Sequence, residues 1–159
     1  MSLPQPVPGL VIRYAYLWAD EHQRGQAEGR KDRPSAVILV TVDEDGARIV
    51  TVLPVTHSPP ANPALAVEIP HATKRRLGLD DARSWVVLTE ANRFAWPGPD
   101  VRCAQAGDLA SVAYGELPGA LLKEIKTKLV QALTARLVRV VPRTESGGDP
   151  PMPALVPGV

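Results

Sequence analysis

A strand–turn–strand pattern near the middle of the chain constrains the fold most. Residues 35–42 (SAVILVTV) form an almost continuous apolar run of strand length. The turn residues Asp43-Glu44-Asp45-Gly46 follow, and a glycine adopts positive φ without a steric penalty. Residues 47–53 return as a second apolar, β-branched run. The pattern predicts a β-hairpin whose first strand is central in a sheet.

Other short apolar runs predict further strands, and one longer pattern predicts a helix. We expect strands at residues 10–18, 64–69, 84–89 and 94–96, and one helical turn at residues 71–77 closed by Gly78. The C-terminal helix, with Pro118 in its first turn, is marked by residues at helical spacing: Leu121, Leu122, Ile125, Leu129, Leu133 and Leu137. Short strands without long helices between them favour a mainly β chain, as a small antiparallel sheet or barrel.

The remaining segments read as connections and ends. Residues 19–33 lack apolar periodicity and are rich in charge and glycine, which predicts a flexible loop. Residues 54–63 are expected to form a loop, since proline lacks the N–H that a central strand donates. Residues 1–8 are predicted to be a flexible N-terminus without signal-peptide character. Residues 143–159, rich in proline and glycine, are expected to be a disordered tail, which leaves one domain at residues 9–142.

Composition limits the function classes. The net charge of the 159 residues is +1, so any anion-binding site must be local. The basic clusters at residues 24–33, 74–76 and 123–128 are interpreted as solvated faces. The lone cysteine, Cys103, excludes an internal disulfide framework and fits a reducing compartment. No apolar run approaches the length of a membrane span, so we expect a cytoplasmic protein without membrane contact.

Several standard chemical motifs are absent from the sequence. The glycines before Lys31 do not have P-loop spacing, and no glycine-rich dinucleotide motif opens a helix. The three histidines lie far apart without paired metal-ligand spacing. Ser58 does not lie in a nucleophile elbow. We therefore expect neither a metal nor a cofactor.

A mixed polar set lies at the predicted strand ends. Arg33 precedes the central strand, Thr56 and His57 follow its hairpin partner, and Glu90 follows the strand at residues 84–89. A guanidinium, a hydroxyl and a carboxylate at neighbouring strand ends suit a phosphate and a proton transfer beside it. This hypothesis requires Arg33 and Thr56 to share one exposed pocket.

Each of these residues also has a plain structural interpretation. Arg33 can pair with Asp32 or Glu28. Thr56 can cap a loop with its hydroxyl, and Glu90 can be a solvated charge at a strand end. The local pattern leaves both interpretations open.

The order of motifs resembles the MazF/PemK (Kid-like) toxins of type II toxin–antitoxin systems, over residues 9–137. The matching features follow the chain: Gly9 before the first strand, Arg33-Pro34 opening an apolar strand, Pro54-Val55-Thr56 after the next strand, Glu90 before Ala95-Trp96, and Leu122, Ile125-Lys126 and Lys128-Leu129 in the helix.

The resemblance implies an SH3-like barrel that acts as a homodimer, cleaves single-stranded mRNA without a metal and is held by a cognate antitoxin. In that chemistry the ribose 2′-hydroxyl attacks the adjacent phosphate and leaves a cyclic phosphate. Carried over by position, Arg33 stabilises or protonates the phosphate and Thr56 hydrogen-bonds to it. Glu28 helps to orient the site, and Glu90 stands near the acidic position that some relatives use as a base.

The expected RNA contacts are basic, polar and aromatic residues near these motifs: Arg30, Lys31, His57, Ser58, Arg93 and Trp96. For Trp96, a structural indole in the core or in a dimer interface is an equal alternative.

The sequence also departs from the family pattern. His57 follows Thr56 where relatives often have Ser or Thr, and the acidic segment is Glu90-Ala91-Asn92-Arg93 instead of an Asp-Gln pair. Leu88 occupies a position that is arginine in some relatives. These departures leave a second function open: a non-catalytic barrel that binds a protein, as CcdB-type barrels do, or binds RNA without cleavage. A plain scaffold domain is a third interpretation.

Overall fold

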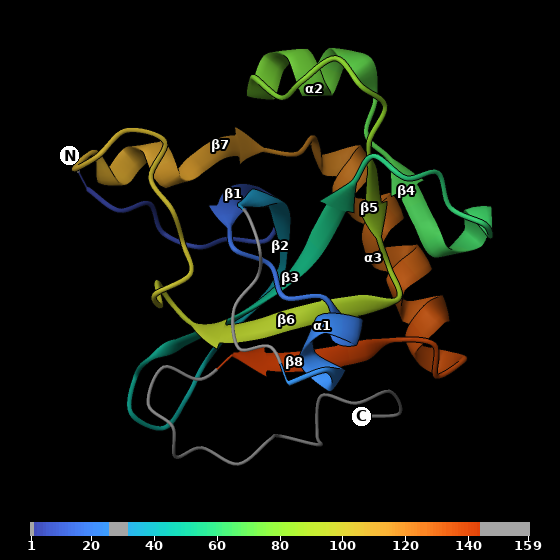
Figure 1. Cartoon of the computed structure of the whole chain (residues 1–159), viewed down its shortest axis with the longest axis horizontal. Coiled ribbons are helices and arrows are strands. Elements are labelled where there is room, and N and C mark those ends of the chain that lie inside the picture. The colour runs from blue at the N-terminus through green and yellow to red at the C-terminus, as the bar shows by residue number, and fades with distance from the viewer. Residues whose placement is uncertain (1, 26–31, 144–159) are drawn as a thin grey trace.

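The predicted fold class, a mainly β chain with a C-terminal helix, is confirmed. A computed structural model describes residues 2–25 and 32–143. Eight strands form one sheet in this part of the chain, and the long helix α3 (Gly119–Thr134) lies beside it (Figure 1). No helix among the described residues is long and apolar enough to cross a membrane.

The central hairpin forms as predicted. Strand β2 (Arg33–Val42) pairs antiparallel with β3 (Arg48–Thr56), from Val42 opposite Arg48 to Ser35 opposite Pro54. Gly46 in the turn has a φ of 85°, which its missing Cβ permits. Strand β1 (Leu10–Tyr14) pairs with the other edge of β2, so β2 is central in the sheet.

The sheet divides at β3. The first half of β3 pairs with β6 (Glu90–Ala95), and its last two residues pair with β5 (Trp85–Val87). Strand β4 (Ala66–Glu68) pairs with β5 and forms one end of the sheet, and β7 (Ala113–Glu116) pairs with β1 and forms the other. Because β4 and β7 end the path without pairing with each other, the described strands do not close into the expected barrel.

Strand β3 extends further than predicted, through Pro54 to Thr56, where a loop was expected. Pro54 lies between Val52, which pairs with β6, and Val55, which pairs with β5. Its missing N–H therefore falls where β3 changes its partner, and that position tolerates proline.

Two segments beside β1 also differ from expectation. The first strand ends at Tyr14, because the backbone N–H of Ala15 bonds to Asp100 and that of Leu17 bonds to the Asn92 side chain. Helix α1 (Ala19–Gln23) begins inside the predicted loop at residues 19–33. The Glu21 carboxylate accepts the N–H of Trp18 at 3.1 Å, which stabilises the start of the helix.

The chain after α3 contains an unpredicted strand. Helix α3 ends at Thr134, three residues before the predicted Leu137, and β8 (Arg139–Arg143) then pairs with β6 in parallel. Its Arg143 begins the predicted tail, and the rest of that tail lies outside the described residues. The sheet is therefore antiparallel except for this one pair.

The short elements largely follow the predictions. Helix α2 (His71–Leu77) is closed by Gly78, whose φ is 73°. One 3₁₀ turn (Pro63–Leu65) precedes β4, and another (Leu109–Val112) precedes β7. Strand β6 begins at Glu90, before the residues 94–96 where a strand was expected.

Apolar side chains pack on both faces of the sheet, because successive residues of a strand point to opposite faces. One core contains Leu53 and Val55 of β3 with Leu121 and Ile125 of α3. The second contains Val50 and Val52 of the same strand with three aromatic residues that are nearly solvent-free: Tyr14, Tyr16 and Phe94. The two cores therefore share β1, β2 and β3.

Candidate functional site

One open pocket lies where β2, β3, α2 and β7 approach each other. Its volume is about 360 Å³. Its polar lining includes Arg13 of β1, Arg33 of β2, His57 after β3, Lys74 of α2 and Asp80 in the loop that follows. The pocket thus collects three basic side chains, a histidine and the carboxylates of Asp32 and Asp80 from segments that are far apart in the sequence.

Arg33 lines this pocket at the start of β2. Its guanidinium carbon lies 4.9 Å from the centre of the Trp18 ring, a cation–π contact. Its Nε is buried and has no hydrogen-bond partner in the described structure. Burial lowers the pKa of Arg33, and the charge of Glu21 opposes that change. The side chain is half-buried, packs on an aromatic ring and carries its positive charge at the wall of the pocket.

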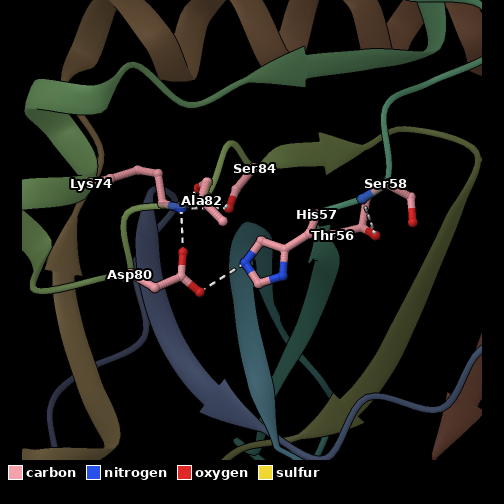
Figure 2. A network of polar contacts seen from close by, with 7 residues as sticks. All are labelled: Thr56, His57, Ser58, Lys74, Asp80, Ala82 and Ser84. Carbon is pink, nitrogen blue, oxygen red and sulfur yellow. Dashed lines mark hydrogen bonds and ion pairs between the residues drawn. The ribbon is translucent and has the colours of Figure 1, made fainter.

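His57 lies on the same pocket and is held by Asp80. Its Nε2 is 2.8 Å from Asp80 Oδ2 (Figure 2). The charged Lys74 lowers the pKa of Asp80, chiefly through a hydrogen bond, so Asp80 acts as an ionised acceptor. In the neutral ring, donation of the Nε2 proton to Asp80 places the lone pair on Nδ1. This arrangement suits a general base.

Lys74 is buried under the loop that carries Asp80. Its ammonium donates to Asp80 Oδ1 at 2.6 Å, to Ser84 Oγ at 2.6 Å and to the carbonyl oxygen of Ala82. All three N–H donors of the ammonium are therefore used within the protein. The interpretation of residues 74–76 as a solvated charge cluster is wrong for Lys74, whose exposure is 2%.

Arg13 and Tyr114 form the opposite wall. The Arg13 guanidinium donates to the Tyr114 hydroxyl at 2.8 Å and to the Ser111 carbonyl at 3.2 Å. It also lies 4.1 Å from the centre of the Tyr114 ring. Both hydrogen-bond acceptors are neutral, so Arg13 adds positive charge to the pocket.

The structure does not bring Thr56 to the pocket, so the requirement that Arg33 and Thr56 share one pocket is not met. Val55 and His57 line it, whereas Thr56, between them, does not. The Thr56 hydroxyl instead accepts the N–H of Ser58 at 3.1 Å, and both residues lie on the side of the strand end away from Lys74 and Asp80 (Figure 2). Strand alternation explains this, because β3 continues through Thr56.

Glu90 is also occupied elsewhere. Its carboxylate accepts the N–H of Ala19 at 2.8 Å and the Tyr16 hydroxyl at 3.3 Å. Burial raises the pKa of Glu90, and the hydrogen bond from Ala19 opposes this. The side chain fastens the start of α1 to β6, and it does not line the pocket.

The remaining predicted site residues lie either outside the pocket or outside the described part of the chain. Arg93 is half-buried on β6 opposite Thr51, outside the pocket. Trp96 packs against the aromatic core, with its ring 6.3 Å from that of Phe94, which favours the structural alternative for this residue. Glu28, Arg30 and Lys31 lie outside the described residues.

Sequence reasoning missed Arg13, Lys74, Asp80 and Tyr114 as pocket residues. A signal existed for Lys74 and Asp80, because Gly78 marks a helix end and a tight turn that brings the following residues back over the helix. No signal existed for Arg13 and Tyr114, since their approach depends on the pairing of β1 with β7.

The pocket offers chemistry for an anion and a proton. In residues 2–25 and 32–143, no three acidic, histidine or cysteine side chains gather closely enough to hold a metal ion. The arginine and histidine groups instead suit a phosphate group, with His57 Nδ1 available to accept a proton. Comparisons with protein-family models and with curated proteins found no match.

Proposed function

We propose that this pocket binds a phosphodiester of single-stranded RNA, and that the protein is a metal-independent endoribonuclease toxin of a toxin–antitoxin pair. The observation that carries the proposal is the convergence of Arg33 and the Asp80-held His57 on one open pocket. The family resemblance of the sequence supports the same reaction class. We also propose that the protein forms a homodimer, lies in the cytoplasm and is bound by a cognate antitoxin.

The pocket groups divide the reaction between them. His57 Nδ1 accepts the proton of the ribose 2′-hydroxyl, whose oxygen attacks the adjacent phosphorus. Arg33 and Arg13 stabilise the negative charge that develops on the non-bridging oxygens. The bond from phosphorus to the 5′-oxygen breaks, a 2′,3′-cyclic phosphate forms, and the leaving oxygen takes a proton from water in the open pocket. In this proposal His57 replaces Thr56 and Glu90 as the group nearest the chemistry.

The test is cleavage of a long single-stranded RNA by pure protein in the presence of EDTA. We expect cleavage by the wild-type protein and a loss of roughly 100-fold or more in Arg33→Ala and in His57→Ala. Arg75→Ala is the matched control, because Arg75 is an exposed cation on α2 outside the pocket. Cleavage that survives both pocket substitutions and is abolished by Thr56→Ala would move the site to Thr56.

The second candidate is a binding module without cleavage. Its support is the position of Thr56 and Glu90, the two groups that the family resemblance assigns to catalysis and that this pocket lacks. Arg33-dependent RNA binding without any cleavage in the same assay would establish this candidate. A short reading frame next to this one that encodes an acidic-tailed protein and relieves growth arrest would favour the toxin.

A further inference from the structure

We propose that Lys74 is a positioning residue, which sets the orientation of the His57 imidazole in the pocket by holding Asp80. The inference rests on the proposed function only for its catalytic consequence. Lys74 is only 2% exposed, and its ammonium bonds to Asp80, Ala82 and Ser84, so it acts on His57 through another residue. Figure 2 shows Asp80 between the two side chains, with one carboxylate oxygen toward each.

The two oxygens of Asp80 have separate partners. Oδ1 accepts the Lys74 ammonium at 2.6 Å and Oδ2 lies 2.8 Å from His57 Nε2. The Asp80 side chain is 56% exposed, so packing does not fix its rotamer. The hydrogen bond from Lys74 is therefore what selects the rotamer that points Oδ2 at the imidazole.

Lys74 also fixes the backbone from which Asp80 projects. Beyond Asp80, its ammonium bonds to Ala82 and Ser84, so three contacts from one buried cation span the loop. The N–H of Leu79 bonds to the Lys74 carbonyl oxygen at 2.9 Å, which closes the turn after α2. The N–H of Ile69 bonds to the Ser84 carbonyl oxygen at 2.9 Å, which ties the far end of the loop to β4.

A structural role alone explains Asp80 Oδ1, because a buried ammonium needs an opposite charge, but it leaves the contact of Oδ2 with His57 unexplained. Burying an ammonium requires acceptors, and the Ala82 carbonyl and the Ser84 hydroxyl already supply two neutral ones. The third acceptor is the Asp80 carboxylate. Its other oxygen faces the pocket and contacts His57, the histidine of the pocket lining. A lysine, a carboxylate and an imidazole in series orient a base and keep its Nε2 protonated.

The test compares Lys74→Met with Asp80→Asn, and uses Arg75→Met on the exposed side of α2 as the control. We expect each of the first two variants to lower kcat for RNA cleavage by roughly 10-fold or more, with KM nearly unchanged. KM is retained because the Lys74 ammonium is already saturated and offers no donor to RNA. Arg33→Ala, in contrast, raises KM as well.

A second readout does not depend on activity. An NMR titration of the Asp80 carboxyl group in Lys74→Met is expected to show its pKa raised toward the ordinary value of about 3.9. The His57 ring resonances are expected to shift in the same variant and to stay in place in Arg75→Met. Unchanged Asp80 and His57 signals in folded Lys74→Met would overturn the positioning role.

The outcomes are distinguishable. If the wild-type protein cleaves no RNA, the proposed function is wrong. The NMR experiment still tests the positioning role of Lys74 in that case. If Lys74→Met does not fold, Asp80→Asn decides, because its exposed side chain tolerates an amide. An unchanged kcat in a cleaving, folded Asp80→Asn protein contradicts the proposal, since Asp80 joins Lys74 to His57.

Discussion

At the scale of single residues, strand alternation decides which side chains form the pocket. Arg33 and His57 were both predicted near the polar rim, and both line the pocket. The expected partnership of Arg33 with Thr56 assumed a loop after Leu53. Because β3 continues to Thr56, Val55 and His57 share one side and Thr56 has the other. Because the strand is three residues longer than expected, His57 lines the pocket with Arg33 in place of Thr56.

Glu90 allows a residue-scale prediction about pH. Burial raises its pKa in the folded protein, so the folded state binds this proton more tightly than the unfolded state does. The contribution of Glu90 to stability therefore falls as pH rises through the ordinary glutamate range toward its folded pKa. Glu90→Gln keeps an acceptor for Ala19 and removes this penalty. We expect the variant to gain stability relative to wild type as pH rises from about 4 to 7 in urea unfolding.

Glu68 is the control of opposite sign. Arg83 lowers the pKa of Glu68 through two hydrogen bonds, at 2.7 and 2.8 Å. Its stabilisation is present above the ordinary glutamate pKa and is lost as pH falls through the folded value. Glu68→Gln is therefore expected to lose stability relative to wild type over the same rise in pH. Parallel trends in the two variants would contradict the assignment for Glu90.

At the scale of elements, local pattern predicted the hairpin, α2 and α3, because periodicity and turn residues lie within each segment. It did not predict α1 or β8. Helix α1 is short and takes its support from Glu90 on a distant strand. Strand β8 follows a helix, contains Pro142 and pairs in parallel with β6, so its partner lies 49 residues earlier, as Glu90 opposite Arg139 shows. Such elements are defined by partners that no local window contains.

Asn92 joins these elements and carries the second stability prediction. Its side chain is fully buried, bonds to both the N–H and the carbonyl of Leu17, and accepts Arg143 of β8 at 3.2 Å. Asn92→Ala removes the partner of the N–H and of the carbonyl of Leu17, and we expect it to lower the free energy of unfolding by about 2–4 kcal/mol. Asn62→Ala, at an exposed cap of a 3₁₀ turn, is expected to cost about 1 kcal/mol or less. Equal losses in denaturant unfolding would refute a joining role for Asn92.

At the scale of the whole molecule, the sequence predicted one domain of mainly β structure, and it did not predict how the sheet ends. A single strand, β3, carries residues of both cores and pairs with β2, β5 and β6. Closure of a barrel requires the two outer strands to meet, and nothing in the local pattern of β4 or β7 specifies that meeting. The pocket is a consequence of the same long-range arrangement, since five of its polar groups come from five different segments.

The shared strands predict that the two cores unfold together. Leu53→Ala removes a buried side chain from the core beside α3, and we expect it to cost about 2–5 kcal/mol. Tryptophan fluorescence reports largely on the other core, because Trp18 and Trp96 both pack there. If β1, β2 and β3 couple the faces, the fluorescence and circular dichroism transitions shift to lower urea by the same amount, with an unchanged slope. If the fluorescence transition stays at its wild-type midpoint while the dichroism transition moves, the two cores unfold independently. The destabilisation of one core then does not lower the stability of the other.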